Sequence, residues 1–363
     1  MRLFYAALCT TVAVSLLAGC SGNTSSPSSS MPSAGGANIR AHGAGFRGGL
    51  AVNAIPERFL PTKLVPIRGR RATSAEMKGI YVSTFDGTSL FGFPKNNAGN
   101  GPSTCSVATG GGVNSFGVDN SGNLIVPNGD EVSGEHTLYV YGPGMCGPFL
   151  GSIVDPYGQP SDASAVSATT GNIAVGNIFD TSGDGSVSVC TLTSGTCSTN
   201  LTNPAILEVG GVGMAANGDC WADAINSDDV AQLVYFAGCS GAGVVATGFV
   251  NPFYGSVDVD GKGNLVTVSL FGPSFSLPSV VYVYSGCNPT CTLISESPLT
   301  GESIFGHLGK QSLRFVTTNL ESSDVEVYRY RPSGLTLNYS FTGGLPCATY
   351  ECEAAAYSPS SAK

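Results

Sequence analysis

The sequence of 363 residues predicts an all-β domain in which a unit of four strands occurs six times in a ring. Three observations predict this fold class: a turn-and-strand motif that recurs at a regular interval, an unusually high content of turn residues, and two chain ends that each hold part of one unit. Gly and Pro number 50 and 21, about a fifth of the chain, while hydrophobic residues reach 42%, enough for a large core.

The recurring motif consists of small and apolar residues, a turn and an alternating strand. It occurs in segments 77–84, 116–128, 164–177, 212–224, 256–269 and 305–317. The strands in these segments are predicted to start at Ile80, Leu124, Ile173, Cys220, Leu265 and Leu313, so that successive starts are 44, 49, 47, 45 and 48 residues apart. Each interval is about the length of a four-stranded propeller blade.

A further strand is predicted after each of these, because aromatic and β-branched residues alternate at 90–93, 138–141, 187–189, 233–236, 281–284 and 325–328. The N-terminal repeat lacks an inner strand, and the C-terminal segment 353–362 supplies one. We therefore predict a six-bladed β-propeller with four-stranded blades, closed by N- and C-terminal strands that share one blade. An open β-solenoid or two stacked sandwiches are the alternatives, and both leave the split repeat unexplained.

One form of the motif, D-x-x-G-N-L-[IV], stands at Asp119–Ile125 and at Asp260–Val266. It resembles the motif of NHL-type and gluconolactonase-like six-bladed propellers, which implies the same fold over about 78–363. The gluconolactonase-like enzymes hold a divalent ion at the channel mouth with Glu, Asn and Asp residues. No such ligand set can be placed in this sequence, and the resemblance therefore supports the fold more than an activity.

The first twenty residues predict export. Arg2 is followed by an uncharged stretch from Leu3 to Ala18, which has the length of a cleaved signal. Leu17-Ala18-Gly19-Cys20 resembles the lipobox of bacterial lipoproteins, which implies a signal peptide over 1–19 and lipidation of Cys20. The chain is then expected in the bacterial cell envelope, with the outer membrane or cell surface favoured. An ordinary secretory signal is the alternative.

Residues 20–77 are predicted to form a disordered tether, rich in Ser and Gly at first and basic later. Residues 1–77 hold eight basic and two acidic residues, so the net charge of −9 leaves −15 for the domain over 78–363. The basic stretch can lie on anionic lipid headgroups or on the acidic domain. The acidic balance argues against nucleic acid as a partner.

Charge is also uneven within the domain. Between Lys95 and Lys262 there are fifteen Asp or Glu residues and no Lys or Arg. Blades one to three are therefore expected to form an acidic half, which serves either solubility or the attraction of a cation or a basic partner.

The twelve Cys residues indicate an oxidising compartment. Cys9 leaves with the signal peptide and Cys20 takes the lipid, so ten remain for five expected disulfides. Cys190–Cys197, Cys287–Cys291 and Cys347–Cys352 flank short connections, Cys220 and Cys239 lie on opposed strands, and Cys105 and Cys146 are left to join neighbouring blades. Spacing does not fix this connectivity. Zinc is the rival interpretation, but no second Cys or His pair lies near Cys287-x-x-x-Cys291.

The sequence offers no recognisable catalytic set. Its three His residues are His42 in the tether, His136 in a loop and His307 in an inner strand, where a packed residue is expected more than a catalyst. It holds no nucleophile elbow or phosphate loop before a helix. Asp258–Asn264 and Asp180–Gly185 are candidate Ca²⁺ loops, but the same residues favour hairpin turns, which is the interpretation we prefer.

Together these features predict a lipid-anchored binding or scaffold module without catalytic residues, metal or other cofactor. We expect a monomer held at the membrane through Cys20, with an unknown protein or small molecule as its ligand. The alternative is a metal-dependent lactonase-like or lyase-like enzyme with a degenerate site at the channel mouth.

Overall fold

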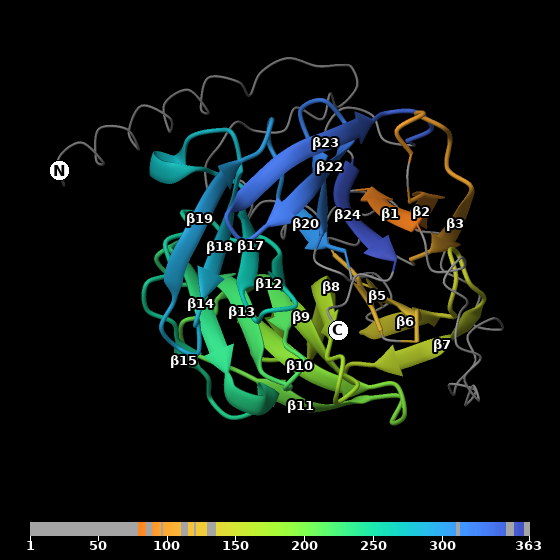
Figure 1. Cartoon of the computed structure of the whole chain (residues 1–363). Coiled ribbons are helices and arrows are strands. Elements are labelled where there is room, and N and C mark those ends of the chain that lie inside the picture. Colours follow the sequence, from red (N-terminus) through yellow and green to blue (C-terminus); the bar gives the residue numbers. More distant parts are fainter. Residues whose placement is uncertain are drawn as a thin grey trace, which may run out of the picture. The chain divides into compact units, whose positions relative to one another are not determined.

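The computed structural model describes residues 79–84, 89–95, 97–109, 115–119, 121–128, 136–309, 313–345 and 352–358 (Figure 1). The expected signal peptide, Cys20, the tether and Cys347 lie outside these residues. Within the described ranges the chain forms strands and two 3₁₀ helices, η2 (Ala237–Cys239) and η3 (Pro273–Phe275), so the all-β prediction is confirmed. No helix in these ranges has both the length and the apolar character needed to cross a membrane.

The strands form antiparallel units of four that follow one another along the chain. The first chain-ordered unit is β4 (Gly117–Val118), β5 (Leu124–Asn128), β6 (Thr137–Tyr141) and β7 (Phe149–Val154). It is followed by β8 (Gly158–Val166), β9 (Asn172–Asp180), β10 (Ser186–Thr191) and β11 (Cys197–Leu201), and then by β12 (Glu208–Met214), β13 (Cys220–Ile225), β14 (Ala231–Phe236) and β15 (Val244–Val245). Next come β16 (Val257–Val259), β17 (Leu265–Ser269), β18 (Val280–Ser285) and β19 (Thr292–Pro298).

The remaining eight strands share one sheet that contains strands from both ends of the domain. Its order is β23-β22-β21-β20-β24-β1-β2-β3. The members are β20 (Phe305–Leu308), β21 (Arg314–Asn319), β22 (Asp324–Arg331), β23 (Gly334–Phe341), β24 (Cys352–Ser358), β1 (Gly79–Thr84), β2 (Ser89–Pro94) and β3 (Cys105–Ala108).

The C-terminal strand β24 lies between β20 and β1. It pairs antiparallel with β1, with Ile80 opposite Tyr357 and Val82 opposite Ala355, and parallel with β20, with Phe305 opposite Ala354. As the sequence predicted, the strand missing from the N-terminal repeat is supplied by the C-terminal segment. Figure 1 shows the sheets following one another around a common centre, with β8, β12, β20 and β24 innermost in their units, which is a propeller-like arrangement.

The predicted strand starts agree with the observed ones to within one residue. The strands β1, β5, β9, β13, β17 and β21 begin at Gly79, Leu124, Asn172, Cys220, Leu265 and Arg314. Leu313, the predicted start of the last of these strands, lies just before β21, and its side chain is 63% exposed.

The D-x-x-G-N motif is a turn that its own aspartate closes. Asp260 Oδ1 accepts hydrogen bonds from the backbone N–H groups of Lys262 (2.8 Å) and Asn264 (2.9 Å), and Oδ2 accepts one from the Asn264 amide (2.9 Å). Asp119 makes the same set of contacts in its own turn, with Ser121 and Asn123. The carboxylate satisfies donors that the tight turn leaves unpaired, which explains the recurrence of Asp and Asn at these positions.

The core lies between neighbouring sheets. One cluster joins Val187 and Val189 of β10 to Val209 and Val212 of β12, and others fill the junctions of other neighbouring sheets. At the β12–β16 junction the two backbone segments approach so closely that a Cβ at Gly211 would collide with the Gly255 carbonyl. A glycine is therefore required there.

Four disulfides lie among the described residues: Cys105–Cys146, Cys190–Cys197, Cys220–Cys239 and Cys287–Cys291. These are four of the five pairs that spacing suggested. Cys352 is also disulfide-bonded, and its expected partner Cys347 lies outside the described residues. One detail differs: Cys239 lies in η2, after β14 has ended at Phe236. The four bonds indicate an oxidising, extracytoplasmic environment.

Candidate functional site

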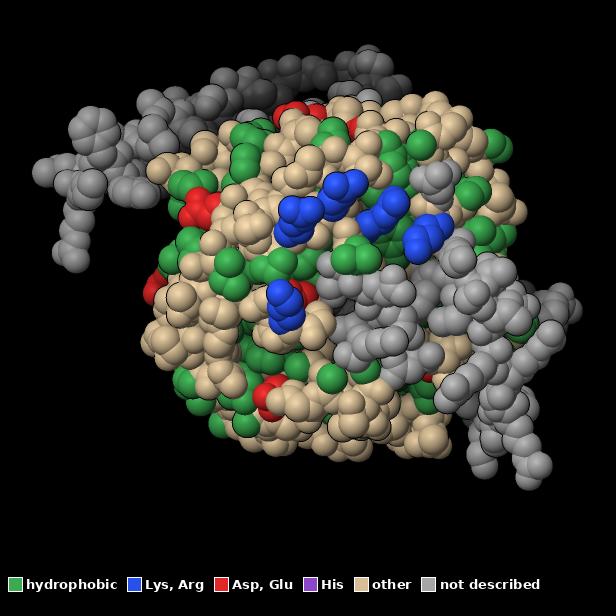
Figure 2. Space-filling model, in the orientation of Figure 1, with side chains coloured by type: hydrophobic (Ala, Val, Ile, Leu, Met, Phe, Trp, Pro, Cys, Tyr) green, Lys and Arg blue, Asp and Glu red, His purple; other side chains and the backbone are tan. Residues whose placement is uncertain are grey.

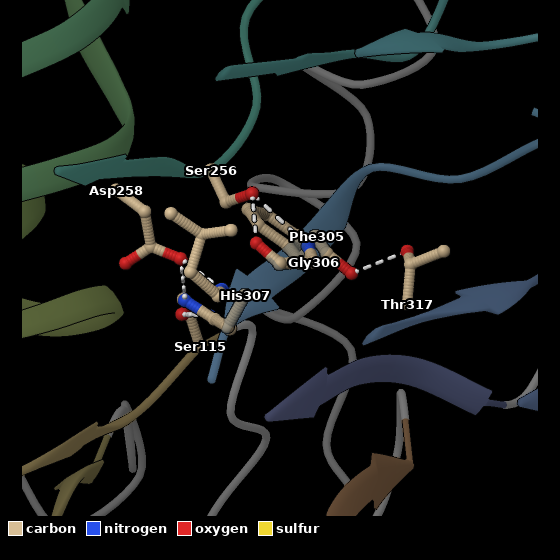
Figure 3. A network of polar contacts seen from close by, with 8 residues as sticks. Ser115, Ser256, Asp258, Phe305, Gly306, His307 and Thr317 are labelled. Carbon is tan, nitrogen blue, oxygen red and sulfur yellow. Dashed lines mark hydrogen bonds and ion pairs between the residues drawn. The ribbon is translucent and has the colours of Figure 1, made fainter. Parts of the chain in front are cut away.

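A chain of three polar side chains connects three sheets at the centre of the domain (Figure 3). Ser115 lies just before β4, His307 on β20 and Asp258 on β16. The Ser115 Oγ to His307 Nε2 distance is 2.6 Å, and the His307 Nδ1 to Asp258 Oδ2 distance is 3.3 Å. The sequence placed His307 in an inner strand but gave no sign of its two partners.

The neighbouring hydrogen bonds define which atoms carry protons. Asp258 Oδ2 also accepts the backbone N–H of Leu308 at 2.6 Å, so the carboxylate faces two donors. A neutral His307 therefore carries its proton on Nδ1 and accepts the Ser115 hydroxyl proton at Nε2, an assignment inferred from these partners. Ser256, just before the strand of Asp258, adds a second contact to β20, because its hydroxyl donates to the Gly306 carbonyl at 2.7 Å.

The order Ser–His–Asp is that of a hydrolytic triad. In such a triad the serine is accessible and the aspartate is buried, whereas here the serine is buried and the aspartate is partly exposed. Ser115 has no exposed surface, whereas the Asp258 side chain is 21% exposed. A serine nucleophile must reach a substrate carbonyl, while the carboxylate behind the histidine is normally buried. In the described conformation the network therefore ties inner strands together and presents a carboxylate, and it does not present a nucleophile.

Two buried acids lie at the junction of the β12–β15 and β16–β19 sheets. Asp223 on β13 has no exposed surface, and its Oδ2 accepts the Gly255 backbone N–H at 3.3 Å, while Oδ1 has no hydrogen-bond partner. Burial raises the pKa of the Asp223 carboxyl well above its usual range. Glu208 at the start of β12 accepts the Tyr254 hydroxyl at 2.8 Å.

A cavity of about 310 Å³ opens between the same two sheets. It lies among the β12–β13 turn, the β16–β17 turn and the segment after β18. Its polar lining comes from Asn217, Asp219, Asp260 and Asn288, and its apolar lining includes Trp221. A concave site with an aromatic side chain and a few polar groups is the usual form of a small-molecule site.

The walls of this cavity are held by covalent and hydrogen bonds. Trp221 Nε1–H donates to the Cys287 carbonyl at 2.6 Å, and the disulfide to Cys291 closes the short loop that carries this carbonyl. Asp219 Oδ1 accepts the Gly238 backbone N–H at 2.7 Å, next to the Cys220–Cys239 disulfide. The cavity is therefore preformed, which lowers the entropic cost of binding.

In the candidate Ca²⁺ loops, the aspartate carboxylates accept hydrogen bonds from groups within the same turns. Asp180 Oδ1 accepts the backbone N–H groups of Ser182 (2.6 Å) and Gly183 (3.2 Å), and these hydrogen bonds outweigh burial and lower its pKa. Asp260 is used in the same way, and its Oδ2 also accepts the Tyr330 hydroxyl at 2.9 Å. The carboxylate oxygens thus face backbone and side-chain donors, as the turn interpretation requires.

One acidic side chain lies close to a pair of sulfur atoms. Asp155, Cys190 and Cys197 are the one group of three possible metal ligands, with ligand atoms within 4.8 Å of one another, among the described residues. Cys190 and Cys197 form a disulfide, so neither is available as a thiolate ligand. Burial raises the pKa of Asp155, which accepts the Ser188 hydroxyl at 2.9 Å.

Comparisons with known proteins give no family. No protein-family model matches the chain, and no curated protein matches it. Among solved structures, a functionally unknown protein from Desulfotomaculum acetoxidans is 11% identical, with 74% of this chain and 88% of that chain covered and a TM-score of 0.48. A protein from Lactobacillus plantarum is 9% identical, with 76% and 97% covered and a TM-score of 0.48.

The WD40 β-propeller domain of Doa1 is 12% identical, with 75% of this chain and 86% of that domain covered and a TM-score of 0.48. Similarities at this level do not bear on what the chain binds.

Sequence reasoning missed both the central network and the cavity. Ser115 and His307 are 192 positions apart, and no motif links them. The cavity had a weaker signal: Trp221 is the one Trp of the chain and follows a turn with the residues Asn217 and Asp219.

Proposed function

We propose that this chain is a lipid-anchored, extracytoplasmic six-bladed β-propeller that acts as a non-catalytic binding or scaffold module. The observation that carries the non-catalytic part is the complete burial of Ser115, the one hydroxyl paired with a histidine in the described part of the chain. The preformed cavity beside Trp221 is our candidate for the binding site.

The blade count rests on the pairing of the chain ends. In the eight-stranded sheet, β20–β23 and β24-β1-β2-β3 are each an antiparallel set of four. Counting them as two blades beside the four separate sheets gives six. A blade built from both chain ends closes the ring and covers edges that would otherwise be open.

The anchor rests on the sequence alone. Cleavage before Cys20 and acylation of its thiol would attach the domain to a bacterial membrane through the tether over 20–77. Two or more acyl chains give stable attachment. The disulfides support an oxidising location, which the envelope provides.

The anchor is tested by metabolic labelling of the full chain with an alkyne fatty acid in a bacterial host. Wild type is expected to incorporate the label and to partition into detergent, whereas Cys20→Ala does neither. Equal labelling of the two proteins would overturn the anchor.

The binding role is tested with a cavity-filling variant and a matched control. Ala216 lines the cavity, whereas Ala242 is exposed elsewhere on the same sheet unit. A thermal-shift screen of small polar solutes is expected to find a compound that stabilises wild type and Ala242→Trp but not Ala216→Trp. Turnover of an ester or a lactone by wild type that is lost in Ser115→Ala, or that requires added divalent metal, would instead establish an enzyme.

A further inference from the structure

The basic residues of this acidic domain are concentrated on one face. Among the described residues the Lys and Arg positions are Lys95, Lys262, Arg314, Arg329 and Arg331. Figure 2 shows Lys and Arg side chains gathered in a row across one face. Four of the five belong to the eight-stranded sheet or its immediate ends: Lys95 follows β2, Arg314 begins β21, and the other two lie on β22.

Two of these arginines face each other directly. Arg314 on β21 is the register partner of Arg329 on β22, and Arg331 lies two residues further along the same strand. Side chains at such positions project from the same side of a sheet. Like charges directly opposite on paired strands destabilise the pair. None of the three arginines makes a salt bridge with a carboxylate of the described chain, so nothing there offsets their repulsion.

Two tyrosine hydroxyls lie beside the Arg314 guanidinium. Arg314 Nη1 and the hydroxyl of Tyr357, a residue only 3% exposed, are both buried, and the hydroxyls of Tyr357 and Tyr339 interact with the Arg314 side chain. Burial raises the pKa of the Tyr357 hydroxyl, and the Arg314 guanidinium acts in the opposite direction, so the two groups are close neighbours. Tyr339, also beside Arg314, belongs to this group. Its hydroxyl donates to the Lys95 carbonyl at 2.9 Å, which places Lys95 next to the tyrosine.

We propose that this basic site, formed by Lys95, Arg314, Arg329, Arg331, Tyr339 and Tyr357, binds the phosphoryl group of a soluble phosphorylated ligand. Phosphoryl oxygens accept several hydrogen bonds at once and carry up to two negative charges, which matches three arginines that form no salt bridge with a carboxylate of the described chain. Because Arg314 Nη1 and the Tyr357 hydroxyl are recessed, a group that can enter between the arginines fits better than a flat anionic membrane.

The proposal requires neither the lipid anchor nor the blade count suggested above. It also assigns a role to the charge pattern. Between Lys95 and Lys262 the chain carries no basic residue and fifteen acidic ones, so this stretch is expected to repel anions, whereas the arginines attract them. An anionic ligand is thereby directed to one site.

The test is calorimetric titration of the full-length protein with inorganic tripolyphosphate at low ionic strength. Arg329→Gln is expected to lower the affinity about tenfold or more, because a charge-assisted hydrogen bond is lost. Lys262→Gln removes the same charge from the exposed turn after β16 and is expected to change the affinity no more than about twofold. Arg329→Lys keeps the charge without the planar fork and should fall between the two.

Tyr357→Phe probes the recessed donors separately from charge. The hydroxyl lies beside the Arg314 guanidinium, so we expect a folded variant with a slightly lower melting temperature and an affinity that falls several-fold. Equal losses in Lys262→Gln and Arg329→Gln would reduce the effect to net charge and overturn the site. Absence of tripolyphosphate binding by a folded wild type would do the same.

A second arm separates a soluble ligand from a lipid headgroup. Wild type and Arg329→Gln are compared on vesicles of phosphatidylcholine with and without phosphatidylglycerol. A soluble ligand predicts no difference between the two proteins on either vesicle. Selective binding of wild type to the anionic vesicles, without binding of tripolyphosphate, would overturn the proposal in favour of a membrane.

Discussion

Neighbouring four-stranded units are joined in two different ways in this molecule. Between β20 and β24 the backbone pairing continues without interruption, so that strands from both chain ends belong to one hydrogen-bonded sheet. Between β12 and β16 the sheets are separate, and the contact depends on the close approach of Gly211 to Gly255 and on hydrogen bonds from Gly255 and Tyr254 to buried acids.

The two junctions therefore depend on different properties of the sequence. The backbone junction requires that β24 be present and tolerates changes in its side chains, since main-chain groups make the contacts. The side-chain junction is sensitive to single atoms. Close packing leaves no room for an added Cβ, and burial leaves an unpaired charge without water. Variants at the two junctions should therefore fail in different ways.

The largest effect is expected from removal of β24. A chain that ends at Cys352 keeps both C-terminal cysteines but loses the strand between β20 and β1, together with the buried residues Ala354 and Tyr357. We expect loss of the cooperative thermal transition measured by circular dichroism. A chain that ends at Ser358 is the control and should melt like wild type. Cooperative unfolding of the shorter chain near the wild-type temperature would show that the backbone junction is dispensable.

The next effect concerns the disulfide that joins the sheet of β1–β3 to the adjacent unit. Cys105 and Cys146 are separated by 41 positions, whereas Cys287 and Cys291 are separated by 4. Loop entropy predicts that replacing the first pair with Ser lowers the free energy of unfolding by about 4 kcal/mol, and replacing the second by about 2 kcal/mol. Urea unfolding measures both. Equal losses would mean that chain entropy does not govern these bonds.

A smaller effect is expected from one methyl group at the side-chain junction. In Gly211→Ala the new Cβ meets the carbonyl of Gly255, and we expect a loss of about 1–3 kcal/mol from overpacking. Gly99→Ala is the matched control, because nothing lies within 4 Å of a Cβ there. If the two variants unfold at the same urea concentration, the glycine contact is not what limits this junction.

The buried carboxyl of the same junction gives a pH-dependent prediction. The pKa of Asp223 is raised in the folded protein, so as pH rises above about 3.9 the unfolded chain ionises this group first. Stability is thereby lost on going from acid to neutral pH. Asp223→Asn removes this loss and should raise the free energy of unfolding by about 1–3 kcal/mol at pH 7, with little change at pH 4. A variant less stable than wild type at pH 7 would contradict the assignment.

Strand positions and turns could be predicted from sequence because they depend on neighbours along the chain. Leu124 and Leu265 begin alternating stretches directly after D-x-x-G-N turns, and the Asp260 carboxylate makes its turn contacts within four residues. The pairing of β24 with β1 was also predictable, because a repeat that lacks a strand and a C-terminal segment that supplies one leave few other arrangements. The disulfides of short loops, such as Cys190–Cys197, follow for the same reason of proximity.

The candidate sites could not be predicted in this way. Ser115, His307 and Asp258 come from three sheets, and the angle at which the sheets pack decides whether their atoms meet. The same holds for the cavity beside Trp221 and for the donors of Arg314 and Tyr357, which lie on different strands of one sheet. Their residues carry no periodic signal that distinguishes them from ordinary core or surface positions.

By itself, the sequence determined the all-β class, the repeating unit, the exchange of a strand between the chain ends and the oxidising environment. These properties arise from hydrogen bonding and alternation over a few residues, or from composition, and they persist in any packing of the sheets. Only the tertiary structure decided that Ser115 is closed to solvent, that a cavity opens between two sheets, and that three arginines share one face. Those outcomes depend on distances between atoms far apart in the chain, which side-chain packing sets.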